Sequence, residues 1–489
     1  MTDAVFKSCS NIYFVGIKGT GVCALAELIH DAGMFVSGSD IPEVFYTDAI
    51  LKKLKIPFYV EFDPVHITKK IDMIIYSAAY SADSNPELAR AQELGIPMLK
   101  YTDALGAWSS QFDSTGICGV HGKTTTTAIC GVLMKAARLP SQVLVGSAVI
   151  DFDERSTITL GDKYFIAETC EYRRHFLSFH PQRIILTSVE CDHQDYFPTY
   201  ESIRGAFVEY CRLLPDDGQL IYCADDPGAG EVAGIIAKEK RDVELIPYGF
   251  TAPGNFKIIS YNVQNERAVF SVAGFPGEIK MRIPGRHEAL NAAASIALVY
   301  SLVKKEGRTL DDNTIKSVKD ALENFKSTKR RSEIIGEAKG IIFMDDYGHH
   351  PTAIKTTLEG IKSFYPSRRL VVSFMSHTYT RTSALLEEFS HCFNDADILF
   401  LHKIYASARE NYKGGVNGRV LFEKTAAVRG NITNSKNKKE TFYIDEVDGA
   451  FSSLCEILKS GDIFITLGAG NNWPLGEKLF KYFKEVNHG

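Results

Sequence analysis

The stretch GICGVHGKTTTT, residues 116–127, constrains the fold of this chain more than any other feature of its sequence. A short apolar run precedes its glycines, and an amphipathic segment follows them, with Ile129, Val132 and Leu133 on one face and Pro140 closing it. A strand, a glycine loop and a helix in this order direct backbone N–H groups and a helix N-terminus at a polyphosphate. The stretch therefore predicts an α/β domain that holds a phosphorylated ligand.

The loop is a short form of the P-loop, because Ile117 stands where the longer pattern has glycine. Lys123 can neutralise phosphate charge, and the hydroxyl of Thr124 can ligate Mg²⁺. A chance glycine–lysine–threonine turn is the alternative, and the other motifs of the chain weigh against it. The predicted phosphate contacts are Gly119, Val120, His121, Gly122, Lys123, Thr124 and Thr125.

Strands alternate with helices in three successive segments, which is typical of parallel sheets covered by helices on both faces. The length of 489 residues also indicates about three domains. We place their boundaries at residues 1–108, 109–325 and 326–489. Within the second segment, residues 256–274 alternate as in an antiparallel patch, and the polar run at 434–440 is interpreted as an exposed loop.

Composition excludes several classes of function. The net charge of −5 gives no support for nucleic-acid binding, and no apolar run approaches the roughly 20 residues that span a bilayer. The N-terminus lacks the pattern of a signal peptide. Ten cysteines are scattered singly, which favours reduced thiols in the cytoplasm. We therefore expect a cytoplasmic protein without membrane insertion.

A second glycine loop, GIKGTGV at residues 16–22, also lies between a predicted strand and a predicted helix. Its spacing, Gly16-x-x-Gly19-x-Gly21, differs from G-x-G-x-x-G and weakens a nicotinamide interpretation. Asp40 falls about where a ribose-binding carboxylate belongs, although mere tight packing is the alternative. Two phosphate loops in different domains indicate two phosphorylated ligands, which the molecule joins or between which it transfers a group.

Metal candidates follow two strands of the second segment. Glu168 ends the strand YFIA, and His193 follows the strand RIILTSV, so both lie at carboxyl ends, where open α/β sheets bind ligands. A carboxylate and an imidazole near Thr124 could complete Mg²⁺ shells around a triphosphate. Surface polar residues are the alternative interpretation, and Asp192 and Asp195 compete as carboxylates.

The third segment offers DDYGHHP, residues 345–351, directly after a predicted strand. The adjacent histidines suggest zinc, but such neighbours rarely point together and no third ligand has suitable spacing, so a substrate or nucleotide contact is favoured. Arg381, after the next strand, suits bidentate binding of a carboxylate or phosphate. The basic run at 329–331 is either a solvated hinge or a phosphate-facing arm.

Ten motifs together resemble, in order, the Mur ligases of peptidoglycan synthesis over nearly the whole chain: GIKGTGV, VSGSD, GVHGKTTTT, TSVECDHQDYF, PGRHEALNAAA, KRRSEIIG, DDYGHHP, TYTRT, ASARE and GDIFITLGAG. The resemblance implies a Rossmann-like N-terminal domain that binds a UDP-sugar. It implies a central P-loop domain with a mostly parallel sheet that binds ATP. The last domain, Rossmann-like, would close on both and admit an amino acid.

Within the family, the motifs are most similar to those of members that join L-alanine to UDP-N-acetylmuramate. The implied activity is an ATP- and Mg²⁺-dependent ligase in which the lactyl carboxylate attacks the γ-phosphate and the alanine amine attacks the acyl phosphate. The alternatives are a ligase for a recycled murein tripeptide, a folate- or cyanophycin-type amide ligase, a nicotinamide dehydrogenase and a non-catalytic UDP-sugar-binding protein. A monomer or a homodimer is expected.

The resemblance also implies roles for particular residues. The P-loop residues named above would bind the phosphates of ATP. His287, Asn291 and Asp346 would contact the nucleotide on its adenine side. The Mg²⁺ ligands are Thr124, Glu168 and His193. The surroundings of alanine and of the sugar-linked carboxylate are Tyr347, His349 and Arg381. The UDP-sugar site is formed by Gly16, Lys18, Gly19, Thr20, Gly21, Asp40 and Ser77. Catalytic roles fall to Lys123, His193, His349 and Arg381.

The chain departs from the family pattern at Cys170, Glu288, Ser332, Thr378 and Asn471, and Lys18 stands where a glycine is common. We expect the charge of Lys18 to lie near the diphosphate of the UDP-sugar. A carboxylate at 288 cannot donate to a purine nitrogen, and threonine at 378 replaces a usual cation. Arg204 occupies the region where several relatives carry a carbamylated lysine, so none is predicted. Since the P-loop, Glu168 and His193 are present, we expect a working enzyme.

Overall fold

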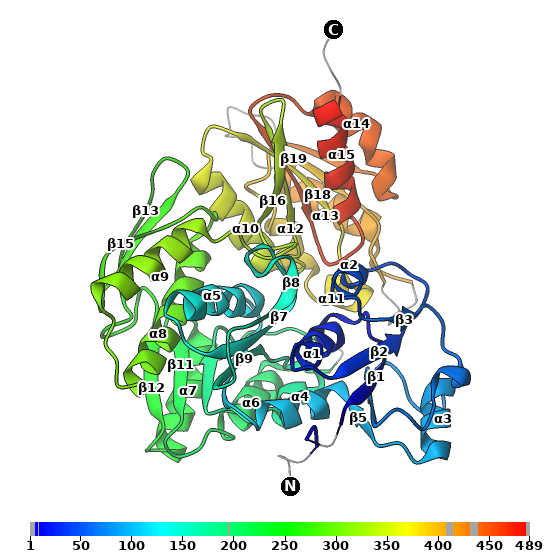
Figure 1. Cartoon of the computed structure of the whole chain (residues 1–489). Coiled ribbons are helices and arrows are strands. Elements are labelled where there is room, and N and C mark those ends of the chain that lie inside the picture. Colours follow the sequence, from blue (N-terminus) through cyan, green and yellow to red (C-terminus); the bar gives the residue numbers. More distant parts are fainter. Residues whose placement is uncertain (1–4, 8, 194–195, 407–413, 431–438, 486–489) are drawn as a thin grey trace.

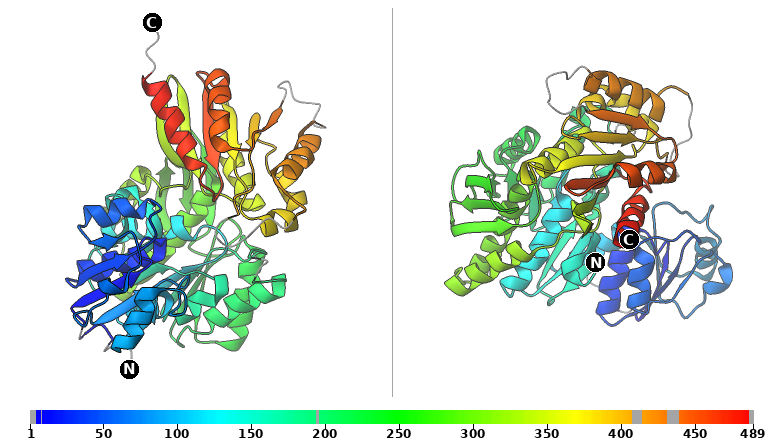
Figure 2. Two further views of the ribbon diagram at one scale, coloured as in Figure 1. Left: turned by 90° about the vertical axis from the view of Figure 1, so that its right-hand side faces the viewer. Right: turned by 90° about the horizontal axis from the view of Figure 1, so that it is seen from above.

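The computed structural model describes residues 5–7, 9–193, 196–406, 414–430 and 439–485. Three bodies, each built on its own large sheet, follow one another along the chain (Figure 1). The C-terminal body lies above the other two, which stand side by side (Figure 2). The expected three-domain α/β fold is thus confirmed. No helix among the described residues is long and apolar enough to span a bilayer.

The N-terminal sheet is entirely parallel in the order β3-β2-β1-β4-β5, which is the Rossmann-like arrangement that was expected. Its apolar strands are buried between helices, as near-continuous hydrophobic runs predict. The strands are β1 (Asn11–Val15), β2 (Phe35–Ser39), β3 (Phe58–Tyr59), β4 (Met73–Tyr76) and β5 (Met98–Lys100). The helices are α1 (Thr20–Asp31), α2 (Thr47–Lys53), α3 (Pro86–Leu94) and α4 (Tyr101–Ser109).

The central sheet has the order β12-β11-β10-β6-β9-β7-β8, and its edge strand β8 runs antiparallel to β7. Its strands are β6 (Asp113–Cys118), β7 (Ser141–Val149), β8 (Arg155–Thr159), β9 (Tyr164–Glu168), β10 (Arg183–Leu186), β11 (Gln219–Cys223) and β12 (Glu244–Tyr248). Its helices are α5 (Lys123–Ala136), α6 (Tyr200–Cys211), α7 (Pro227–Glu239), α8 (Arg286–Lys305) and α9 (Asp312–Asn324). The antiparallel patch is confirmed as β13 (Ile258–Val263), β14 (Ala268–Val272) and β15 (Phe275–Met281).

The C-terminal sheet has the order β16-β17-β21-β18-β19-β20, with β16 antiparallel to β17. Its strands are β16 (Glu333–Ala338), β17 (Ile341–Asp346), β18 (Arg369–Phe374), β19 (Ile398–Leu401), β20 (Glu440–Tyr443) and β21 (Asp462–Leu467). Its helices are α10 (Pro351–Phe364), α11 (Tyr379–Ala384), α12 (Leu386–His391), α13 (Gly418–Gly430), α14 (Phe451–Ile457) and α15 (Trp473–Glu485). Residues 434–438 of the polar run lie outside the described residues, and Glu440 begins β20.

A buried ion pair ties the first two domains together. Glu27 of α1 accepts a 2.9 Å hydrogen bond from Nε of Arg155 on β8, and a second from the hydroxyl of Thr157. The central and C-terminal domains instead share a hydrophobic cluster. These contacts set the carboxyl ends of β6, β9 and β10 opposite those of β17 and β18.

Candidate active site

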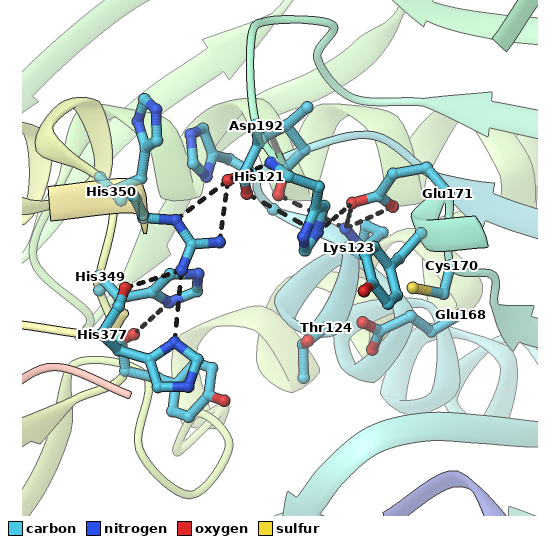
Figure 3. Close-up of a pocket in the computed structure, with 18 of the residues that line it drawn as sticks. His121, Lys123, Thr124, Glu168, Cys170, Glu171, Asp192, His349, His350 and His377 are labelled. Carbon is cyan, nitrogen blue, oxygen red and sulfur yellow. Dashed lines mark hydrogen bonds and ion pairs between the residues drawn. The ribbon is translucent and has the colours of Figure 1, made fainter. Parts of the chain in front are cut away.

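A cavity of about 630 Å³ lies between the central and C-terminal domains (Figure 3). Its walls are the segments that follow the carboxyl ends of β6, β9, β10, β17 and β18. The structure therefore brings together the P-loop, the predicted metal ligands and the predicted amino-acid side. The predicted residues that line it are Val120, His121, Gly122, Lys123, Thr124, Glu168, His193, Tyr347, His349 and Arg381.

The P-loop connects β6 to α5 in a backbone shape that two glycines permit. Gly119 has φ +135° and Gly122 has φ +80°, a region that side chains with a Cβ disfavour. A Cβ on Gly119 would lie 2.1 Å from Oγ1 of Thr187, and one on Gly122 would lie 2.8 Å from Oδ1 of Asn291. Both glycines are therefore required by space as well as by conformation.

Lys123, the first residue of α5, forms an ion pair with Glu171. Its Nζ lies 3.0 Å from Oε2 of Glu171 and also donates to the carbonyl of Gly119. Burial alone would lower the pKa of Lys123, but Glu171, Cys170 and Glu168 raise it more, so the net pKa is raised. Burial raises the pKa of Glu171, and Lys123 and His193 lower it below its usual range. The lysine is thus held charged beside the loop.

Glu171 is a site residue to which no role was assigned from the sequence. Its position three residues after Glu168, directly beyond the end of β9, is the signal that could have identified it. Strands β6 and β9 are neighbours, so residues after β9 face the P-loop that follows β6.

Thr124, Glu168 and His193, the three predicted Mg²⁺ ligands, all line the cavity. Ile117 of β6 pairs with Glu168 of β9, and Figure 3 shows Thr124 and Glu168 on the same side of Lys123. One oxygen of Glu168 accepts a 2.9 Å hydrogen bond from the N–H of Gly146, which orients the carboxylate. Nε2 of His193 lies 3.5 Å from Oε1 of Glu171. A hydroxyl and a carboxylate oxygen supply the hard donors that Mg²⁺ prefers, so this set fits the ion.

Replacing His193 with alanine should raise the Mg²⁺ concentration required for half-maximal phosphate release, or stop turnover. The reason is that the change removes one of three groups predicted to hold the ion, while Glu168 and Thr124 remain. A Mg²⁺ titration of phosphate release measures the effect, with His391→Ala on the exposed helix α12 as the matched control. An unchanged titration in the His193 variant would remove this residue from the metal site.

Asp192 and Arg381 form a buried ion pair across the domain boundary. Nε and Nη2 of Arg381 donate to Oδ1 of Asp192 at 3.1 and 2.9 Å. Burial raises the pKa of Asp192, but Arg381 and the nearby histidines lower it far more, so the net pKa is well below its usual range. Asp192 is thus engaged by arginine, which weakens its candidacy as a metal carboxylate. The rival Asp195 lies outside the described residues.

His349 follows β17 and is held in one tautomer. Its Nδ1 lies 3.0 Å from the carbonyl oxygen of Tyr347, which can only accept, so Nδ1 carries the proton and Nε2 presents a lone pair. Burial, and secondly the charge of Arg381, lower the pKa of His349 well below its usual range. The ring is therefore neutral at pH 7.

The depressed pKa of His349 predicts acid sensitivity. The unfolded chain takes up this proton near pH 6.5 and the folded protein does not, so stability should fall as pH drops below that value. The asparagine variant of His349, which can keep the hydrogen bond to Tyr347, should lose less stability between pH 7 and 5, by up to about 1.4 kcal/mol per pH unit. Urea unfolding of both proteins in metal-free buffer measures this. Parallel stability curves would contradict the prediction.

The predicted adenine-side residues come from two domains: His287 and Asn291 lie near the start of α8 in the central domain, and Asp346 ends β17 of the C-terminal domain. The amide of Asn291 on α8 accepts from the hydroxyl of Thr126 at 3.1 Å and donates to Glu288 at 3.1 Å. Glu288 also lies 3.3 Å from Nε2 of His287, so the unusual carboxylate is satisfied inside the protein. Asp346 accepts from the N–H groups of Ser332 and Gly348 at 2.7 Å each. These contacts are structural, and the nucleotide roles stay predictions.

The predicted UDP-sugar residues gather around the N-terminal glycine loop, away from the cavity lining. Thr20 and Gly21 begin α1 behind Gly19, and a Cβ on Gly16 would lie 2.9 Å from Cβ of Ser77. Both oxygens of Asp40 accept backbone N–H groups, from Lys18 at 2.7 Å and from Ile41 at 2.8 Å. The carboxylate therefore shapes the loop.

Lys18, whose charge the sequence placed near the diphosphate, turns its side chain into the domain, and its role toward the UDP-sugar stays a prediction. Its side chain is buried, and Nζ donates to the carbonyls of Ile41 and Glu43 at 2.8 and 2.9 Å. The ammonium also lies 3.4 Å from Asp48. Burial against these acceptors directs the charge into the domain.

The basic run 329–331 was interpreted as either a solvated hinge or a phosphate-facing arm, and its residues differ in this respect. Lys329 pairs with Glu333 at 2.8 Å and Arg330 with Asp345 at 3.0 Å, so both stabilise the hinge. Arg331 lines the cavity and stacks over Tyr347, with its guanidinium carbon 5.2 Å from the ring centre.

The remaining departures from the family pattern fall in different surroundings. Cys170 and Thr378 line the cavity, and Ser332 is buried beside Asp346. Asn471 is exposed, and no contact explains its identity. The ASARE motif lies, from residue 407 onward, outside the described residues.

Three α/β domains, with a P-loop that faces the third domain across a cavity, define a three-domain protein of the P-loop class. Three family models match in order: "Mur ligase family, catalytic domain" at residues 11–113, "Mur ligase middle domain" at 117–299 and "Mur ligase, glutamate ligase domain" at 330–470.

Relatives match over nearly their whole length. A UDP-N-acetylmuramate–L-alanine ligase of Treponema pallidum is 50% identical over 97% of this chain and 97% of its own length. One of Borrelia garinii is 40% identical over 97% of this chain and 99% of its own length. The crystal structure of a UDP-N-acetylmuramate–alanine ligase from Thermotoga maritima is similar with a TM-score of 0.77 and 23% identity, over 98% of this chain and all of that one. The chain belongs to the Mur ligase family, and it is a ligase.

Proposed function

We propose that this protein joins L-alanine to the lactyl carboxylate of UDP-N-acetylmuramate, with ATP as co-substrate and Mg²⁺ as its metal ion. The observation that carries the proposal is the cavity, where the P-loop of one domain faces Arg381 and His349 of the next. The names of the relatives at 50% and 40% identity support the choice of substrates.

The reaction requires activation, since a carboxylate is a poor acyl donor at neutral pH. A lactyl oxygen attacks the γ-phosphorus, the bond from that phosphorus to the bridging oxygen breaks, and ADP leaves. The amine of L-alanine then attacks the carbonyl carbon of the acyl phosphate, phosphate departs, and the amine gives up a proton. The two steps together form one amide bond per ATP.

The side chains around the cavity suit these steps. Lys123 offsets charge where two anions approach each other, and bound Mg²⁺ would supply further charge neutralisation from the set Thr124, Glu168 and His193. Arg381 presents a guanidinium that suits a carboxylate. The lone pair of His349 Nε2 is a suitable acceptor for the amine proton, because that nitrogen is unprotonated at pH 7.

Phosphate release with UDP-N-acetylmuramate and each amino donor in turn tests the proposal. We expect release with L-alanine above that with glycine or L-serine, and none without the UDP-sugar. Turnover with the murein tripeptide but not with L-alanine would favour the recycling ligase. Binding of the UDP-sugar without any phosphate release would favour a non-catalytic protein.

We also propose that the reaction takes place in the cytoplasm, where ATP is available. All ten cysteines of the chain are free thiols in the structure, which supports a reducing compartment. A monomer or homodimer remains our expectation.

A further inference from the structure

Three potential metal ligands from distant parts of the sequence meet beside the P-loop. They are His121 in the loop itself, Glu190 after β10 and His350 at the start of α10. One ligand atom of each lies within 4.8 Å of the others. The first two belong to the central domain and the third to the C-terminal domain, so the cluster spans the boundary. Figure 3 shows the rings of His121 and His350 near each other.

His350 has one nitrogen engaged and the other available. Its Nδ1 accepts the backbone N–H of Thr352 at 3.3 Å and caps α10. The residue is only 5% exposed, and its Nε2 has no hydrogen-bond partner among the described residues. A buried and unpaired imidazole nitrogen is costly unless something binds it.

The other two groups already approach each other. Nε2 of His121 contacts Oε1 of Glu190, while Oε2 of Glu190 accepts from the hydroxyl of Thr352 at 3.1 Å. The ring centres of His121 and His350 are 5.3 Å apart. Two imidazoles and an oriented carboxylate are therefore within reach of a single ion.

We propose that His121, Glu190 and His350 form a binding site for a divalent transition-metal ion such as Zn²⁺. Imidazole nitrogen with one carboxylate is a donor set for such ions, whereas the predicted Mg²⁺ set beside it is richer in oxygen. Three protein ligands leave a fourth position for water or a phosphate oxygen. His121 and His350 line the cavity, so that position opens toward it.

The protonation states agree with this assignment. Burial raises the pKa of Glu190, but His121 and His350 lower it below its usual value. Burial, then the neighbouring His121, lower the pKa of His350. The cluster therefore favours an ionised carboxylate and a neutral imidazole, the forms in which these groups bind metals.

The neighbouring His349 is not part of this cluster. Its Nδ1 donates to the carbonyl of Tyr347. The two adjacent histidines thus have different partners, in line with the expectation that such neighbours rarely point together. Sequence spacing gives no sign of these ligands, because the partners of His350 lie 160 and more than 200 residues earlier in the chain.

Calorimetric titration of the whole protein with Zn²⁺, in excess Mg²⁺ and without nucleotide, tests the site. The variants are Glu190→Gln, which keeps the shape of the side chain, and His350→Asn, which keeps a helix-capping acceptor. Loss of an outer-shell partner typically lowers metal affinity roughly 10–100-fold. Loss of a direct ligand should lower the affinity for Zn²⁺ by at least as much. The matched control His349→Asn and the variant His193→Ala should both retain the site.

The outcomes separate clearly. Equal affinity in wild type, Glu190→Gln and His350→Asn would overturn the proposal, as would absence of a Zn²⁺ site in wild type or its loss in His193→Ala alone. Thermal unfolding by circular dichroism verifies that each variant is folded. If one variant fails to fold, visible absorption of Co²⁺ bound to the other decides. The readout is metal binding, so failure of the ligase proposal would leave it unaffected.

Discussion

Replacement of Lys123 by alanine is expected to abolish phosphate release while UDP-sugar binding stays nearly intact. The ammonium is the cation that α5 directs at the P-loop, and it offsets charge as the carboxylate approaches the γ-phosphate. Removal of one such electrostatic group costs roughly 10²–10³-fold in turnover, and here the group acts between two anions, so the loss should be at least this large. Single-turnover phosphate release and calorimetry with UDP-N-acetylmuramate measure the two effects.

The same change leaves Glu171 as a buried charge without its main partner, which costs about 3–5 kcal/mol of stability. The double variant Lys123→Ala, Glu171→Gln separates the two effects, because it removes the stranded carboxylate. We expect its stability to recover and its turnover to remain lost. Retained turnover in the single variant would contradict the assignment of the ATP loop, and recovery in the double variant would reduce Lys123 to a partner of Glu171.

The second large effect is expected at the pair Asp192 and Arg381, and the two residues should act in opposite directions. In the structure Arg381 is held by Asp192, so a substrate carboxylate that uses the guanidinium must compete with the aspartate. Arg381→Met should raise the KM for L-alanine roughly tenfold or more, since a hydrogen bond to a charged group contributes about 1.5–3 kcal/mol. Asp192→Asn should lower this KM, because a neutral amide competes less well than a carboxylate with the substrate for the guanidinium of Arg381.

Stability provides the control for this pair. Each single variant strands a buried charge and should cost about 3–5 kcal/mol, whereas the double variant should be less affected than the sum of the two. Steady-state kinetics on folded protein and urea unfolding measure both quantities. A higher KM in Asp192→Asn would show that the aspartate orients Arg381 for the substrate and would contradict competition.

The division of the chain into three α/β domains was predictable, because the sequence patterns that indicate it lie within each segment. Apolar strands, glycine loops and amphipathic helices recur in three segments, and the residues after strands β6, β9, β10, β17 and β18 were recognised as site candidates. Carboxyl ends of parallel strands lie at one edge of a sheet, so this rule predicted that Lys123, Glu168 and His193 would meet. The short polar strand β20 lacked such a signal.

The pairings between these residues were not predictable. Lys18 lies within the glycine loop, where a phosphate-binding cation is plausible, yet its side chain turns into the domain because two carbonyls and Asp48 lie there. Asp192 resembles a metal ligand in the sequence, but the approach of another domain supplies Arg381 as its partner. Such choices depend on tertiary distances that sequence spacing does not contain.

The chemical course is tested most directly with ¹⁸O in the lactyl carboxylate of UDP-N-acetylmuramate. If that carboxylate attacks the γ-phosphate, one labelled oxygen remains on the phosphorus when the amine displaces it. We predict that mass spectrometry of the phosphate released during turnover with L-alanine finds one ¹⁸O atom per phosphate. Unlabelled phosphate, with one labelled oxygen kept in the amide carbonyl and the other lost to water, would contradict the account.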